Sequence, residues 1–217
     1  MGKIMEAVFC VFYMIFVTIL GIKIVKNAKG KKEILWFGTM SLVLVFGDAF
    51  HLVPRVLEAV NRAGDYHAAK GIGTLITSVT MTLFYLILFF VYSVRYQWKN
   101  RILEGIMVLL TIIRIVLCLL PQNDWTGDSP VIWGIYRNIP FFIMGFLMMV
   151  LFFLERKDKA YSLMYLAITL SFLFYVPVVL WADVHPMIGM CMLPKTCMYI
   201  WIVWMGYRES RKGQENV

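Results

Sequence analysis

Seven apolar stretches of about 20 residues, separated by short polar connections, decide what this chain can fold into. They cover residues 4–25, 34–57, 71–94, 102–120, 131–154, 161–182 and 187–207. A helix needs about 20 apolar residues to cross the hydrocarbon core of a bilayer, and each stretch meets that requirement. The sequence therefore predicts an all-α, polytopic membrane protein in which residues 1–217 form a single seven-transmembrane helix bundle.

The composition leaves no room for a separate soluble domain. Hydrophobic residues make up 61% of the chain and charged residues 16%, whereas a soluble domain carries about 25% charged residues. The net charge of +8 is divided among short connections and is not gathered on one face, which argues against nucleic acid as a partner. Any function is therefore expected within the bundle or its connections, with membrane lipids as neighbours.

Lysine and arginine are unequally divided between the two sides of the predicted bundle. Fourteen of the 21 basic residues fall in connections 23–32, 95–101 and 156–159 and in tail 208–212. The basic residues of the opposite side are Lys3, Arg55, Arg62 and Lys70. Cytoplasmic loops carry the excess of Lys and Arg. We therefore predict an N-terminus outside and a C-terminus in the cytoplasm, in a bacterial plasma membrane.

Polar and ionisable side chains inside four of the apolar stretches indicate a site. They are Asp48, His51, Arg114, Arg137, Asn138 and Lys195. A charge at the bilayer centre costs about 2.5–3.5 kcal/mol on insertion scales, so such residues usually mark function or an internal pair. At 1.5 Å per residue, the four charged ones lie roughly 9–13 Å below the outer boundary of a ~30 Å core. We predict that these four line one cavity that opens to the outside.

Asp48, His51 and Arg55 share one helix face, because their spacing is i, i+3 and i+7. One interpretation is a structural clamp, in which Asp48 is ionised and paired with a basic residue of another helix. The alternative is general acid–base chemistry by Asp48 and His51. The basic groups outnumber Asp48, so an anionic lipid or small molecule would complete the cavity. The expected ligand-binding residues are Arg55, Arg114, Arg137, Asn138 and Lys195.

Four prolines lie in or at the ends of the apolar stretches, all in the predicted outer half of the bundle. They are Pro54, Pro140, Pro177 and Pro194. A proline inside a helix frees the carbonyl four residues before it. Membrane helices tolerate such breaks where neighbours or a wet cavity satisfy the backbone. The prolines therefore indicate either cavity building or ordinary kinking.

A metal site is not expected. His51, His67 and His185 all lie at or near the predicted outer side and could surround a metal together with Asp183. The last stretch has no HxxxH pair of the kind found in seven-helix membrane zinc hydrolases. The four cysteines (Cys10, Cys118, Cys191 and Cys197) fall in apolar stretches without zinc-ligand spacing. We predict no metal and no cofactor.

The segment Gly47-Asp48-Ala49-Phe50-His51-Leu52-Val53-Pro54-Arg55 resembles the GDAxxLxPR stretch of the YhhN-like lysoplasmalogenase family. Gly71-Ile72-Gly73-Thr74, leading to Phe84-Tyr85, is loosely similar to the helix that follows in that family. The resemblance covers about a quarter of the chain. It implies a membrane enzyme that cleaves the vinyl-ether bond of lysoplasmalogens, with Asp48 as a catalytic carboxylate. Family members usually have eight spans and a later Ser-Asp motif, where this chain has Ser171-Phe172.

Three functions therefore stand as alternatives. The first is a hydrolase of lysophospholipids or vinyl-ether lipids that uses Asp48 and His51. The second is a protein that binds, senses or transports a small anion. The inner halves of the stretches carry almost no polar groups, which disfavours a path through the membrane. The third, a retinal receptor with Lys195 as the attachment point, lacks the usual counterion, since residues 71–94 contain no acidic residue.

Overall fold

The computed structural model describes residues 2–61, 64–127, 129–182 and 184–215. Arg62 and Asp183, which the sequence analysis named, lie outside these residues. Seven helices of the described chain are long and apolar enough to cross a membrane, which confirms the predicted all-α bundle. They are α1 (Gly2–Asn27), α2 (Lys32–Val60), α3 (His67–Arg95), α4 (Arg101–Leu119), α5 (Val131–Leu154), α6 (Met164–Trp181) and α7 (Met192–Glu215).

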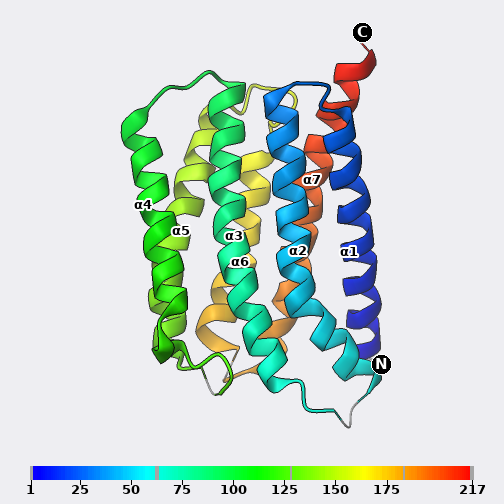
Figure 1. The fold of residues 1–217 in the computed structure, drawn as a ribbon, viewed down its shortest axis with the longest axis vertical. Coiled ribbons are helices and arrows are strands. Elements are labelled where there is room, and N and C mark those ends of the chain that lie inside the picture. The colour runs from blue at the N-terminus through cyan, green and yellow to red at the C-terminus, as the bar shows by residue number, and fades with distance from the viewer. Residues whose placement is uncertain (1, 62–63, 128, 183, 216–217) are drawn as a thin grey trace.

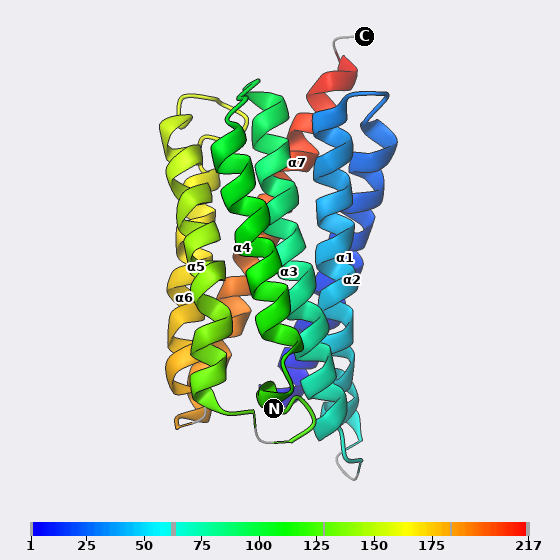
Figure 2. The same ribbon diagram turned by 60° about the vertical axis from the view of Figure 1, so that its left-hand side comes forward.

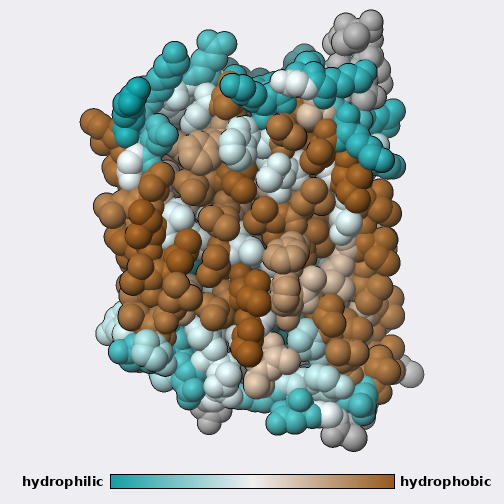
Figure 3. Space-filling view, in the orientation of Figure 1, coloured by the Kyte–Doolittle hydropathy of each residue, from teal (hydrophilic) through white to brown (hydrophobic). Residues whose placement is uncertain are grey.

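The seven helices form a closed ring in chain order. Each helix packs against the next one, and α7 closes the ring by packing against α1 (Figures 1 and 2). Contacts between α2 and α7 and between α3 and α5 cross the ring. On the face shown in Figure 3, apolar side chains cover the middle of the bundle and hydrophilic side chains gather at its two ends. This surface is the one that a bilayer requires.

The two ends of the bundle differ in their connections. The N-terminus lies at the same end as the α2–α3, α4–α5 and α6–α7 connections (Figure 1). We call this the N-terminal end. The C-terminal end holds the α1–α2, α3–α4 and α5–α6 connections and the end of α7. The basic connections of the sequence analysis are therefore all at the C-terminal end.

Three helix starts differ from the sequence prediction by three residues or more. Helix α3 begins at His67, four residues before the predicted start. Helix α6 begins at Met164, and residues 161–163 form turns instead of its first turn. The seventh apolar stretch begins with the 3-10 helix η2 (Pro186–Cys191), and α7 starts at Met192. Pro54, Pro140 and Pro177 lie inside helices as expected. Pro194 does not interrupt α7, because the amides of a first turn have no partner within the helix.

Helices α2 and α3 approach closely at two glycines. A Cβ on Gly73 would collide with the backbone carbonyl of Phe50, and a Cβ on Gly47 would collide with Thr80. Small residues allow membrane helices to approach in this way. The hydroxyl of Thr77 then donates a hydrogen bond of 2.9 Å to the carbonyl of Gly47. This contact fixes the segment of α2 that carries Asp48 and His51 against α3.

A cluster around Arg95 ties four parts of the chain together at the C-terminal end. The Arg95 guanidinium donates to Glu33 of α2, to Asp158 of the α5–α6 connection and to Glu209 of α7. The shortest of these contacts is 2.9 Å, to Glu209. Tyr161 donates a further hydrogen bond of 2.9 Å to Glu33. We call these five residues the Arg95 cluster, and it holds this end of the bundle in one arrangement.

Asp158 makes the Arg95 cluster sensitive to acid. Burial alone would raise the pKa of Asp158, but hydrogen bonds from the Ala160 amide and the Tyr96 hydroxyl, together with the charge of Arg95, hold it below its usual value. A carboxyl whose pKa is lowered by folding stabilises the fold above its unfolded pKa of about 3.9, and this contribution is lost as pH falls through the folded pKa.

We therefore expect Asp158→Asn to lower the melting temperature at pH 7 and to reduce the acid-induced loss of stability below about pH 4. Melting curves of detergent-purified protein across pH measure both effects. Glu104→Gln is the matched control, since Glu104 is exposed at the same end of the bundle. Parallel acid melting profiles for the parent and Asp158→Asn would contradict the assignment.

Candidate functional site

The interior of the N-terminal half contains a cavity of about 290 Å³ with a strongly basic lining. We call it the basic chamber. Its polar and charged lining residues include Arg55, Arg114, Arg137, Lys195, His51 and Asn138. These side chains come from α2, α4, α5 and α7. Among the described residues that line the chamber there is no carboxylate, so its positive charge is not balanced from within.

Arg114 is the most deeply buried charge of the basic chamber, with a side chain that is 1% exposed. Its Nη2 donates a hydrogen bond of 3.3 Å to Oδ1 of Asn138, and its guanidinium lies over the ring of Phe141. Nε and Nη1 are buried and have no hydrogen-bond partner among the described residues. Buried donors are nearly always paired, because an unpaired one costs about 1–3 kcal/mol.

Asn138 holds Arg114 in place. Its Oδ1 accepts hydrogen bonds from both Arg114 and the Tyr175 hydroxyl, and its Nδ2 donates to the carbonyl of Gly134 at 2.8 Å. These contacts fix the orientation of the amide group, with Oδ1 toward Arg114 and Tyr175 and Nδ2 toward the backbone of α5. Asn138 therefore positions the guanidinium of Arg114, a residue that lines the cavity.

Arg137 lies nearer the mouth of the basic chamber. Its Nη1 donates to Asn123 at 2.8 Å and to Ser129 at 3.3 Å, and its guanidinium lies over the Trp125 ring. These partners belong to the α4–α5 connection. Arg137 also lines an open vestibule of about 700 Å³ at the N-terminal end, together with His67 and Lys70. The basic chamber is therefore continuous with the surface at that end.

Lys195 lies between the basic chamber and a second, narrow cavity of about 40 Å³, which we call the small chamber. Its Nζ lies 3.8 Å from the centroid of the Tyr175 ring and 5.8 Å from that of Tyr199. The aromatic faces stabilise a cation without neutralising it. Asp48 lines the small chamber only, whereas His51 and Lys195 line both chambers. The prediction that Asp48 shares one cavity with Arg114, Arg137 and Lys195 is therefore wrong for Asp48.

Asp48 is bound differently from the sequence prediction. The hydroxyl of Tyr13 donates a hydrogen bond of 2.6 Å to its Oδ2. Lys195 acts on Asp48 electrostatically, but no basic side chain of the described chain forms an ion pair with this carboxylate. The expected clamp to a basic residue of another helix is therefore absent from the described contacts. The reason is the ring closure, which brings α1 and its tyrosine against this face of α2.

His51 contacts α3 and not Asp48. Its Nδ1 lies 3.2 Å from the Thr74 hydroxyl oxygen. The single hydrogen of that hydroxyl is used in a 2.8 Å bond to the carbonyl of Lys70. Nδ1 is therefore the donor, and the proton-accepting nitrogen of a neutral His51 is Nε2. The structure brings Asp48 and His51 to one small chamber but does not link them directly.

Three residues of this region were not predicted. They are Tyr13, Tyr175 and Glu6, which contact Asp48, Asn138 and Arg55 respectively. Tyr13 and Tyr175 lie in apolar stretches where a tyrosine is ordinary, so nothing local marks them. Glu6 carried a usable signal, since an acidic residue near the start of an apolar stretch needs a partner.

The described residues include no group of three His, Cys, Asp or Glu side chains placed to hold a metal ion. His67 lines the vestibule and His185 is exposed on the α6–α7 connection.

Comparison with protein-family models, with curated proteins and with solved structures gave no match for this chain. The function must therefore be argued from the chambers themselves.

Proposed function

We propose that the protein binds an anionic group, a phosphate or a carboxylate, in the basic chamber. One observation carries the proposal: Nε and Nη1 of Arg114 are buried and unpaired beside a cavity whose described lining contains no carboxylate. Guanidinium and ammonium groups in a desolvated site bind oxyanions through short, charge-assisted hydrogen bonds. Arg114 and Lys195 supply the buried charges, and Arg55 and Arg137 lie toward the vestibule.

The ligand reaches this chamber from outside the cell. Supporting this orientation, the vestibule lies at the N-terminal end, whereas the basic connections lie at the opposite end. The unequal distribution of Lys and Arg favours a cytoplasmic position for the C-terminal end. A reporter that is active only in the cytoplasm should therefore be active when fused after residue 217, and a reporter that is active only after export should be inactive there. The opposite result would reverse the assignment.

Anion binding is tested by thermal unfolding of the purified protein. A ligand that binds the folded state alone raises the melting temperature in a concentration-dependent way. We expect inorganic phosphate or glycerol 3-phosphate to produce this rise. Two controls, glycerol and sodium chloride at the same ionic strength, should produce none. Equal melting temperatures with all four additives up to high millimolar concentration would refute anion binding.

The second candidate function is hydrolysis of a lysophospholipid or vinyl-ether lipid, as the GDAxxLxPR resemblance implies. The observation that favours it is the shared wall of the two chambers. A ligand held by Arg114 borders His51 and Lys195, and the small chamber beyond them contains Asp48. Asp48 would act as general acid, with His51 Nε2 as the base that accepts a proton from water. Water addition to a vinyl ether would release an aldehyde and a glycerophospho compound.

A further inference from the structure

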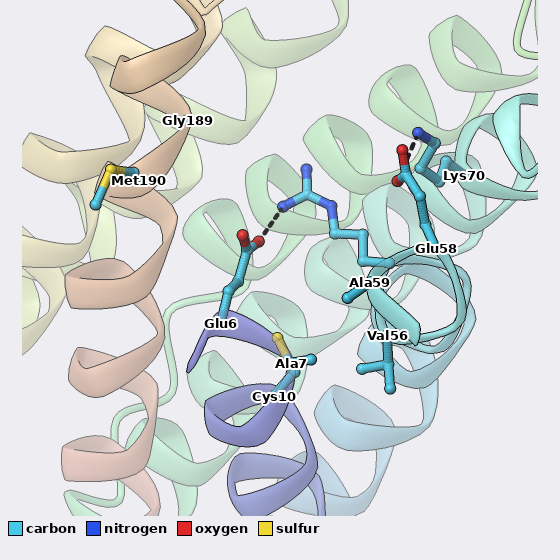
Figure 4. Close-up of a pocket in the computed structure, with 10 residues that line it drawn as sticks. Glu6, Ala7, Cys10, Val56, Glu58, Ala59, Lys70, Gly189 and Met190 are labelled. Atoms are coloured by element: carbon cyan, nitrogen blue, oxygen red, sulfur yellow. Dashed lines mark hydrogen bonds and ion pairs between the residues drawn. The ribbon is translucent and has the colours of Figure 1, made fainter. Parts of the chain in front are cut away.

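A fourth cavity, of about 410 Å³, lies where the helix ring closes between α1, α2 and η2 (Figure 4). We call it the side pocket. Ala7 and Cys10 of α1, Val56 and Ala59 of α2 and Met190 of η2 form its apolar lining. Met190 is 62% exposed, so this wall also faces the surroundings of the bundle. Four charged residues complete the lining: Glu6, Arg55, Glu58 and Lys70. The side pocket is thus a recess at the edge of the ring with both apolar and charged walls.

The side pocket adjoins the basic chamber. Arg55 and Gly189 line both cavities. On the side-pocket side, Arg55 forms an ion pair of 3.4 Å with Glu6, which Figure 4 shows across the recess. Both partners are about one-third exposed, with side-chain values of 34% and 39%. An ion pair this exposed contributes little to stability, so separating it to admit a ligand costs little.

The basic chamber alone is small for a lipid. Its volume of about 290 Å³ is at the lower end of the roughly 300–1,000 Å³ usual for small-molecule pockets. It suits an anionic headgroup, and the apolar wall of the adjoining side pocket suits an aliphatic chain. Two charged pairs, Glu6–Arg55 and Glu58–Lys70, line the same pocket. Charged pairs beside an apolar wall match the boundary between lipid headgroups and chains.

From this juxtaposition we infer that the ligand is a single-chain anionic amphiphile. Its anionic headgroup lies in the basic chamber, and its chain passes Gly189 and Arg55 into the side pocket. The inference rests on the proposed anion-binding function and adds the chemical class of the ligand. It also assigns the passage at Gly189 as the element that admits the chain.

Gly189 offers a direct test of this passage. A Cβ built on Gly189 would meet no atom within 4 Å, so a larger side chain can be accommodated there without collision at its first atom. A leucine at this position would extend into the passage. Gly105 of α4 is the matched control, because a Cβ there also meets nothing within 4 Å. It lies in the first half of α4, which starts at the C-terminal end, and it lines none of the cavities described above.

The experiment compares three probes in phosphatidylcholine nanodiscs. Glycerol 3-phosphate supplies the headgroup alone, palmitoyl lysophosphatidic acid the headgroup with a chain, and monopalmitoylglycerol the chain with a neutral headgroup. For the parent we expect lysophosphatidic acid to bind most tightly, because each buried methylene adds affinity. Gly189→Leu should weaken the binding of lysophosphatidic acid by about tenfold or more, or about 1.4 kcal/mol. It should weaken glycerol 3-phosphate by a clearly smaller factor, because Gly189 also lines the basic chamber. Gly105→Leu should affect neither probe.

Any other pattern of binding among the three probes and two variants overturns the inference. If lysophosphatidic acid binds no more tightly than glycerol 3-phosphate, or if Gly189→Leu weakens both probes by the same factor or weakens neither, the chain does not use this passage while anion binding stands. Equally tight binding of monopalmitoylglycerol shows that the anion is not recognised. Failure of every probe refutes anion binding and the inference together.

A crosslinking readout keeps the inference testable if Gly189→Leu does not fold. Lysophosphatidic acid with a photoreactive diazirine at the end of its chain should label parent peptides that contain Ala7–Cys10 or Val56–Ala59. Excess unlabelled lysophosphatidic acid should prevent this labelling, and monopalmitoylglycerol should not. Labelling confined to other helices would place the chain elsewhere and overturn the inference.

Discussion

Replacing Arg114 with methionine is expected to abolish anion binding. The same substitution is expected to raise the melting temperature of the unliganded protein above that of the unliganded parent. The first effect follows from the loss of Nε and Nη1, the buried donors without a partner among the described residues. Hydrogen bonds to charged groups contribute about 1.5–3 kcal/mol each, so losing two of them weakens binding by roughly 100-fold or more.

The second effect of Arg114→Met follows from the cost of burying the charge. Replacing buried ionic groups by apolar side chains of similar volume is often neutral or stabilising by about 1–4 kcal/mol. The substitution leaves no new unpaired acceptor, because Oδ1 of Asn138 keeps its 3.0 Å hydrogen bond from Tyr175. Stability and binding should therefore change in opposite directions, as expected for a residue retained for its ligand.

Arg101→Met is the matched control, because Arg101 is exposed at the start of the same helix. It should leave binding unchanged and move the melting temperature little. Isothermal titration with glycerol 3-phosphate and melting curves of unliganded protein measure the two effects. A variant Arg114→Met that melts below the parent and still binds the anion would show that Arg114 stabilises the helix packing and does not serve a ligand.

Asp48→Asn is expected to abolish any lysolipid hydrolysis while leaving anion binding intact. An asparagine still presents an oxygen to the hydroxyl of Tyr13, so the 2.6 Å contact between α1 and α2 has a substitute and the fold is retained. It cannot exchange a proton near neutral pH. A positioned general acid or base contributes about 10²–10⁴-fold to a rate, and a loss of that size is the expected result.

Aldehyde release from a lysoplasmalogen by the parent, by Asp48→Asn and by Tyr13→Phe measures this role. Tyr13→Phe removes only the hydroxyl that donates to Asp48. It should reduce turnover less than Asp48→Asn does. Turnover that survives in Asp48→Asn would exclude the carboxylate from the chemistry. A parent without activity on a panel of lysolipids would eliminate the hydrolase and leave the binding function.

The helices could be predicted from the sequence because the requirement that produces them is local. Each stretch must be long and apolar by itself, whatever its neighbours are. The two errors at the starts of α6 and α7 arose where apolar residues continue into turns or a 3-10 helix. At those positions hydrophobicity remains high while the backbone geometry changes, so composition does not mark the boundary.

Part of the site was also visible in the sequence. Arg114, Arg137 and Lys195 interrupt apolar stretches at similar depth, and the structure places all three on one chamber. Their partners were not visible, since the contact between Asp48 and Tyr13 depends on how α1 closes the ring. Arg95, counted as a basic residue of a connection, in fact contacts three carboxylates that come from distant segments.

The Arg95 cluster has a mechanical consequence. It joins α2, α3, α7 and the α5–α6 connection at the C-terminal end. Close-packed aromatic side chains, including Tyr85, Phe141 and Phe172, pack at the wall of the basic chamber, which Phe141 itself lines. Helix movements that would admit the proposed ligand are then expected in the N-terminal half, because the Arg95 cluster holds the helices together at the C-terminal end. A lipid ligand would enter and leave through the same leaflet, so occupancy of the chamber would report the composition of that leaflet alone.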